Sequence, residues 1–182
     1  MTHTITRLIC LVVTAVASTA LVTPPSGAAP TWKPVTNLFT DLSAAGGSAQ
    51  TPAVAVDSRG DATAVWSRYE GTQFVVQAST RPAGSAWSAP VDLAAGRRIY
   101  HPQLVVDPAG NATAIWRRSE LDRSVVQAAT RPAGGDWTAA VDLSDDAPVD
   151  LSDGDEIPRL AVAADGAVTA IWSHYDGARY TV

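Results

Sequence analysis

The sequence predicts an all-β protein built from tandem units of about fifty residues, and three observations support this. A block recurs at 52–66, 102–116 and 158–172, reading PAVAVDSRGDATAVW, PQLVVDPAGNATAIW and PRLAVAADGAVTAIW. A glycine-containing turn signal divides each block into two runs of β-branched and small apolar residues, as in a hairpin. The chain of 182 residues is 46% hydrophobic and 17% charged, which favours a packed core over disorder.

The second half of the unit also repeats. Residues 74–93 read FVVQASTRPAGSAWSAPVDL, and residues 124–143 read SVVQAATRPAGGDWTAAVDL. The proline and glycine in the middle of each copy indicate a further turn between two strands. The first unit is therefore expected to contain four strands, at 53–57, 62–68, 74–81 and 86–93.

Both faces of these strands are mostly apolar or small, so each sheet is expected to be covered on both sides. Stacked four-stranded antiparallel sheets meet that need, and the sequence thus predicts a partial β-propeller of tandem blades. We expect Trp66, Trp116 and Trp172 to fill the spaces between blades. The six tryptophans fall at two equivalent places in the unit and could instead form sugar-stacking platforms, but their periodicity favours a core role. A β-sandwich is the main alternative, but it does not require a repeat with its turns in register.

The chain start reads as a secretory signal, with an apolar run from 8 to 22 and small residues before a cleavage point near Ala29. A membrane anchor is the alternative, but that run is shorter than the roughly twenty residues that span a bilayer. The expected organisation is a signal peptide (1–28), an N-terminal segment with a blade outer strand (29–51), blade 1 (52–101), blade 2 with an acidic loop insertion (102–157) and a partial blade 3 (158–182). These features predict secretion.

The net charge and the cysteine content limit the expected classes of binding partner and the expected disulfides. The formal net charge is −5, which disfavours nucleic acid and anionic membrane surfaces, and no membrane segment is expected after signal cleavage. The only cysteine, Cys10, lies within the predicted signal, so no disulfide is expected in the secreted form. The partial third unit predicts either a piece of a longer propeller or a homodimer that completes a ring.

The order of these elements resembles the blades of the sialidase-like or BNR-like propeller superfamily. The matching parts are Pro52, the turn at 57–60, Trp66 and the segment STRPAGSAWSAP at 79–90. The full Asp box of that superfamily, S-x-D-x-G-x-T-W, is absent: Arg81 stands in place of its aspartate, and Ala129 replaces the serine in the second copy. The resemblance implies a shared blade architecture and weakens transfer of enzymatic activity.

Sialidases of this fold use three arginines, a tyrosine–glutamate nucleophile pair and an acid–base aspartate. Tyr69 and Glu70 are adjacent, and adjacent strand residues point to opposite faces, so they are not expected to form that pair. No catalytic residue is predicted, and no cofactor. Whether the chain is an enzyme stays open, and a non-catalytic role is favoured.

The loop that follows the second strand varies between units, as binding loops do. It carries the predicted ligand-binding residues Arg68, Tyr69, Arg118, His174 and Tyr175, which would meet at one rim if the blades share an orientation. We expect a secreted non-catalytic binding module for carbohydrate or an extracellular protein partner. The alternatives are a fragment of a sialidase-like glycoside hydrolase, a purely structural surface repeat, and a solvated rim that binds nothing.

The sequence predicts no metal site. The acidic residues between 145 and 156 contain Asp153-Gly154-Asp155, which is compatible with calcium, but a solvated duplicated loop explains them equally well. His101 and His174 lack a third ligand at zinc spacing. Asn111 begins a glycosylation sequon, and its place directly after a turn glycine indicates a structural role.

Overall fold

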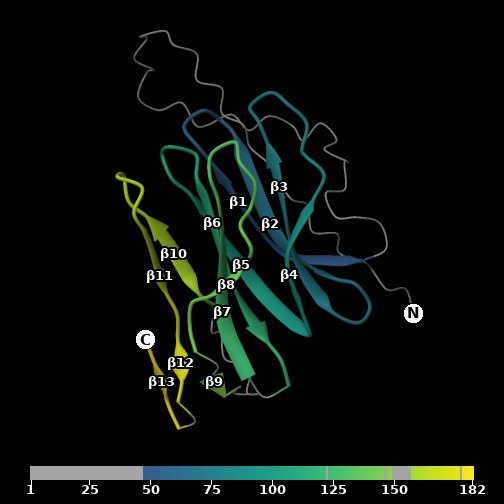
Figure 1. Cartoon of the computed structure of the whole chain (residues 1–182), viewed down its shortest axis with the longest axis vertical. Coiled ribbons are helices and arrows are strands. Elements are labelled where there is room, and N and C mark those ends of the chain that lie inside the picture. The colour runs from purple at the N-terminus through teal and green to yellow at the C-terminus, as the bar shows by residue number, and fades with distance from the viewer. Residues whose placement is uncertain (1–46, 122, 146, 149–156, 177) are drawn as a thin grey trace, which may run out of the picture. The chain divides into compact units, whose positions relative to one another are not determined.

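The computed structural model describes residues 47–121, 123–145, 147, 148, 157–176 and 178–182. All regular secondary structure in these ranges is β-strand, which confirms the all-β prediction (Figure 1). The described residues lie in one compact unit, Leu42–Val182. Within them, no helix is long and apolar enough to cross a membrane.

The first repeat is a four-stranded antiparallel sheet with neighbours in chain order, formed by β1 (Ser48–Val56), β2 (Ala62–Tyr69), β3 (Phe74–Arg81) and β4 (Val91–Gly96). The second repeat has the same order, with β5 (Arg98–Val106), β6 (Ala112–Ser119), β7 (Arg123–Arg131) and β8 (Val141–Asp142); β9 (Ala147–Pro148) also pairs with β7. The third repeat contains two hairpins, β10 (Arg159–Val162) with β11 (Val168–Ile171) and β12 (His174–Tyr175) with β13 (Tyr180–Thr181).

Two strand boundaries differ from the prediction. The first strand of each full repeat starts before the proline, at Ser48 and Arg98, because a bulge lets the strand continue through it. Thr51 and His101 have φ of 48° and 49°, and the pairing register shifts at both places. The fourth strand begins at Val91, because the segment before it bonds to the end of β3 through the Ser88 N–H and the Thr80 carbonyl.

The turn between the first two strands is built the same way in the two full repeats. The Asp57 Oδ1 atom accepts hydrogen bonds from the backbone N–H groups of Arg59 and Asp61 at 2.9 and 3.0 Å. Asp107 Oδ1 accepts from the Asn111 N–H at 2.8 Å. The turn glycine in each repeat has φ near +90°, a conformation that L side chains rarely adopt.

Turns of successive repeats also touch. A Cβ added to Gly110 would lie 2.1 Å from Arg59 Nη2 and 2.9 Å from Asp57 Oδ2, so only glycine fits against this ion pair. A Cβ on Gly166 would lie 3.3 Å from Asp107 Oδ2. Repeats 2 and 3 thus each present the turn glycine to the turn aspartate of the repeat before.

The sheets of repeats 1 and 2 pack face to face. Strand β5 lies against both β1 and β2, and β10 lies against β5 (Figure 1). The buried residues of the first interface come from both repeats: Val65, Val76, Ala78, Ile99, Ala114, Trp116 and Ala129. Trp66 and Trp116 are 4% and 0% exposed, which confirms that these tryptophans are core residues.

A buried polar chain crosses three strands in each full repeat. The Trp66 indole N–H donates to Gln77 Oε1 at 3.2 Å, and Gln77 Nε2 donates to Asp92 Oδ1 at 2.7 Å. In the second repeat, Trp116, Gln127 and Asp142 make the same two bonds at 3.1 and 2.7 Å. The glutamine satisfies a buried indole donor, which would otherwise destabilise the core.

Candidate ligand-binding cleft

An open cleft of about 630 Å³ lies between repeats 1 and 2. One wall comes from β3, β4 and the segment that joins them, and the other comes from the loop that follows β7. Its polar and aromatic lining includes Ser88, Asp92, Arg131, Asp136, Trp137 and Thr138. This volume falls in the range of sites that bind small molecules.

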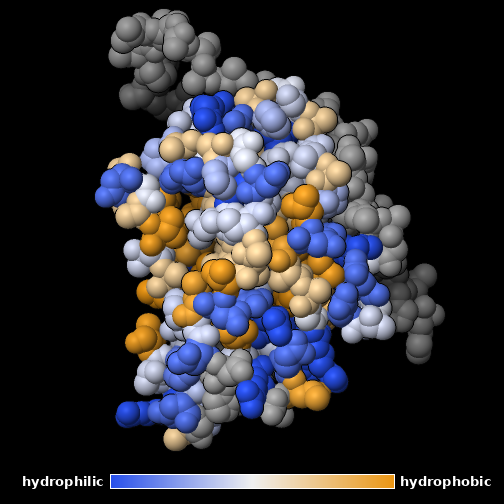
Figure 2. All heavy atoms as spheres, viewed as in Figure 1, coloured by the Kyte–Doolittle hydropathy of each residue, from blue (hydrophilic) through white to orange (hydrophobic). Residues whose placement is uncertain are grey.

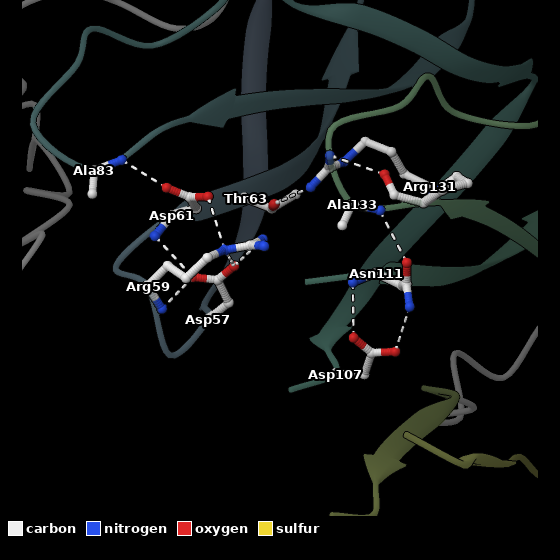
Figure 3. A network of polar contacts seen from close by, with 10 residues as sticks. Asp57, Arg59, Asp61, Thr63, Ala83, Asp107, Asn111, Arg131 and Ala133 are labelled. Atoms are coloured by element: carbon white, nitrogen blue, oxygen red, sulfur yellow. Dashed lines mark hydrogen bonds and ion pairs between the residues drawn. The ribbon is translucent and has the colours of Figure 1, made fainter. Parts of the chain in front are cut away.

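The loop that carries Trp137 is fixed to its own sheet. Gly135 N–H donates to the Pro132 carbonyl at 2.9 Å, and Thr138 N–H donates to the Thr130 carbonyl at 2.8 Å. Asn111 Oδ1 accepts from the Ala133 N–H at 2.9 Å, which ties the loop to the first turn of the repeat (Figure 3). The cleft wall is therefore held in shape before any ligand binds.

The Trp137 side chain packs partly on the core, and its indole N–H group has no described hydrogen-bond acceptor. Its side chain is half-buried and packs against the core cluster between the two repeats. Its indole Nε1 is buried and has no hydrogen-bond partner among the described residues. Asp92, across the cleft, is oriented by the bond from Gln77 to its Oδ1 atom.

A smaller cavity of about 230 Å³ shares Thr80, Arg131 and Gly135 with the cleft. The ion pair between Arg59 and Asp57, with Nη2 and Oδ2 2.7 Å apart, lies at its edge. Figure 3 shows Arg131 reaching across from repeat 2 towards these residues and Thr63. Arg131 therefore lines both cavities and is the shared residue that carries a charge.

Three charged groups of this region have shifted pKa values. Burial alone would raise the pKa of Asp57, but hydrogen bonds from the Asp61 backbone and from Arg59 outweigh it and lower the pKa. The side-chain amide of Asn111 is the main cause of the lowered pKa of Asp107. Desolvation lowers the pKa of Arg131, which Asp61 and Asp57 partly oppose. Arginine nevertheless keeps its charge in a protein.

The residues predicted from the variable loops lie at the opposite strand ends. Arg68 and Arg118 each pair with the glutamate two positions further on, Glu70 and Glu120. Tyr69 donates to the Gly71 carbonyl, and its ring stacks on a neighbouring phenylalanine. Arg118 also lies against Gly96, where its Cγ would be 3.0 Å from an added Cβ.

His174 and Tyr175 form β12, in the third repeat. They line a cavity of only about 10 Å³ together with Arg117, which leaves no room for a ligand larger than water. The Tyr175 ring stacks on Tyr180 with centroids 5.0 Å apart. None of the five predicted residues, all of which the structure describes, lines the larger cleft.

Sequence reasoning missed the cleft residues Asp92, Arg131, Asp136 and Trp137. Trp137 recurs at a fixed place in the unit, which favours a core role over a sugar-stacking platform, and its half-buried side chain packs against the core cluster while also lining the cleft. Asp136 gives the available signal, because the equivalent position in the first repeat is Ala86. The second copy thus carries a charge at a place where the first has none.

Figure 2 shows hydrophobic residues gathered across the middle of the face in view, with hydrophilic residues towards both ends. Val168 and Ile171 of the third repeat are 39% and 55% exposed.

The described residues contain no group of three or more side chains suited to a metal ion. The candidate calcium residues Asp146, Asp150, Asp153, Asp155 and Glu156 lie outside the described residues. No family model, curated protein or solved structure matches the chain.

Proposed function

We propose that this protein is a secreted, non-catalytic binding module with propeller-type blades, and that it binds neutral sugars in the cleft beside Trp137. The observation that carries the proposal is a preformed cleft of about 630 Å³ that combines an indole with two carboxylates and a guanidinium. The resemblance of the repeat to sialidase-like blades and the predicted signal peptide support the architecture and the location.

The cleft suits the surface of a pyranose. One face of the sugar ring is apolar and packs on an aromatic plane, while its hydroxyl groups need planar donors and acceptors. Trp137 supplies the plane, Asp92 and Asp136 supply acceptors, and Arg131 supplies donors. Two carboxylates against one guanidinium give this cleft a negative field, which favours a neutral glycan over an acidic one.

Three turn aspartates with shifted pKa values do not suit a role in hydrolysis. A glycosidase needs a carboxylic acid whose pKa is raised, so that it donates a proton to the leaving group. The pKa of each of Asp57, Asp107 and Asp176 is lowered, and none of the three lines the cleft. These groups accept hydrogen bonds in turns, which is a structural role.

Affinity electrophoresis tests the proposal. The secreted form is run through native gels that contain hydroxyethylcellulose, galactomannan, laminarin or soluble starch, beside gels without polysaccharide. At least one neutral polymer should retard the wild type. Trp137→Ala should weaken that retardation about tenfold, the loss expected from an aromatic contact of about 1.5 kcal/mol.

Trp87→Ala is the matched control, because Trp87 holds the equivalent position in repeat 1 and does not line the cleft. It should keep wild-type retardation. Retardation by none of these neutral polymers, or an unchanged Trp137→Ala variant, would contradict the proposal. Turnover of a fluorogenic sialoside would instead support the sialidase-like hydrolase, and no binding or turnover would leave a structural repeat.

A further inference from the structure

Two equivalent arginines have different partners. In repeat 1 the Arg81 guanidinium lies over the Trp87 ring, with its Cζ atom 5.3 Å from the ring centroid. In repeat 2 the equivalent Arg131 donates from Nη2 to Thr63 Oγ1 of repeat 1 at 3.2 Å (Figure 3). Its Nη1 also donates to its neighbouring Pro132 carbonyl at 3.4 Å.

The loops themselves do not explain this difference. Both arginines precede Pro-Ala-Gly, and in both loops a tryptophan follows six positions after the arginine. The turn bonds to Pro82 and Pro132 are both 2.9 Å, and the turn glycines Gly84 and Gly134 have φ of 74° and 69°. Arg131 therefore has the same access to its tryptophan that Arg81 has, and the partner in the preceding repeat makes the difference.

The Thr63 hydroxyl competes strongly for the guanidinium. Thr63 is 2% exposed, and Arg131 is the only described partner of its hydroxyl. A hydrogen bond from a charged donor to a buried hydroxyl is worth more than a partly exposed cation–π contact, and its loss leaves that hydroxyl unsatisfied. The contact between repeats therefore keeps Arg131 away from the indole.

We infer that Thr63 is a positioning residue that holds Arg131 off the Trp137 ring and so keeps the sugar-stacking face open. This inference rests on the proposed function of the cleft for its biological meaning, but the geometry is testable without a ligand. Thr63 itself does not line the cleft, and its hydrogen bond from Arg131 links it to a residue that does. Ligand binding is then coupled to the packing of repeat 1 on repeat 2.

Hydroxyl-radical footprinting read by peptide mass spectrometry follows Trp137 and Trp87 separately. Thr63→Val keeps the shape of the side chain and removes the acceptor, so Arg131 should move onto Trp137 and lower its labelling rate towards that of Trp87. Thr63→Ser keeps a hydroxyl and should retain the wild-type rate. In the hydroxyethylcellulose, galactomannan and laminarin gels, Thr63→Val should weaken retardation about fivefold, the change expected for loss of one hydrogen bond.

Arg131→Ala separates positioning from a general packing role. Both Thr63→Val and Arg131→Ala break the same hydrogen bond, so a packing role predicts Trp137 labelling to change in the same direction. The positioning role predicts opposite directions, with labelling lowered by Thr63→Val and raised or unchanged by Arg131→Ala. The double variant should label like Arg131→Ala.

Unchanged or increased Trp137 labelling in Thr63→Val would overturn the inference. If circular dichroism shows that Thr63→Val does not fold, Thr63→Ala replaces it with the same expected direction. A wild type that binds none of the neutral polymers, but shows the opposite labelling changes, would refute the proposed function and leave the positioning role standing. Loss of binding by Trp137→Ala with no labelling change in Thr63→Val would support the proposed function and refute the positioning role of Thr63.

Discussion

Replacement of Gln127 by leucine tests the buried polar chain that crosses each full repeat. The Gln127 side chain accepts from the Trp116 indole at 3.1 Å and donates to Asp142 at 2.7 Å. Trp116 is 0% exposed, so its N–H group has no route to solvent when its acceptor is removed. Leucine has a comparable volume but no polar atom, so the substitution removes both bonds.

The expected cost follows from the two groups left behind. A buried indole N–H without an acceptor costs about 1–3 kcal/mol of folding free energy. Asp142 is exposed and regains water, so the loss of its bond adds only about 0.5–1 kcal/mol. The sum is about 3 kcal/mol, which lowers the urea midpoint by about 1.5 M for a slope near 2 kcal/mol/M.

Urea unfolding followed by tryptophan fluorescence and circular dichroism measures this change. Asp142→Asn is the control, because an amide oxygen still accepts from Gln127 and the expected loss is below about 1 kcal/mol. The double variant Trp116→Phe with Gln127→Leu removes the stranded donor and should be less destabilised than the two single losses added together. A Gln127→Leu loss below about 0.5 kcal/mol would refute the reasoning.

Three further predictions concern the turns and the strand ends. Gly110→Ala should lower the melting temperature by several degrees more than Gly134→Ala, because only the added Cβ at Gly110 meets Arg59 and Asp57, and differential scanning calorimetry compares the two. The pKa of Asp57 is lower in the folded chain than its ordinary value of 3.8, so the ionised form stabilises the fold above that pH and the effect disappears as pH falls below it. The difference in unfolding free energy between wild type and Asp57→Asn should therefore narrow as the pH falls below about 3.8, and a constant difference would contradict this prediction. Arg118→Gln should leave polysaccharide retardation unchanged, and a loss of binding would return the site to the variable loops.

The repeat made most of the fold predictable, because its turns carry local signals. Strand β3 was predicted with its observed bounds, and the aspartate and glycine of the first turn marked the hairpin between β1 and β2. The start of β1 was not predictable, because proline normally interrupts a strand and only the bulge at Thr51 lets pairing continue across it. The late start of β4 depends on Ser88 bonding to Thr80, a contact that sequence spacing does not specify.

The candidate cleft was much less predictable than the strands. It forms where β4 of one repeat meets the loop after β7 of the next, and a single unit contains only one wall. Trp87 and Trp137 look equivalent in the sequence, yet in the part of the chain that the structure describes Arg81 lies over the Trp87 ring, whereas Arg131 bonds to Thr63 of the preceding repeat. Such a difference depends on packing between repeats, which periodicity alone does not reveal.

The contact between successive turns gives the repeats a direction. At both described junctions the turn aspartate of the earlier repeat lies against the turn glycine of the later one, as Asp107 and Gly166 do. Repeat 3 has the glycine, but Ala163 stands where the earlier repeats have aspartate. If the order of the repeats were changed so that repeat 3 preceded another repeat, no aspartate would lie against the turn glycine of the following repeat. The repeats are therefore not interchangeable. A rearranged protein with repeat 3 in an earlier place should include Ala163→Asp to restore this contact.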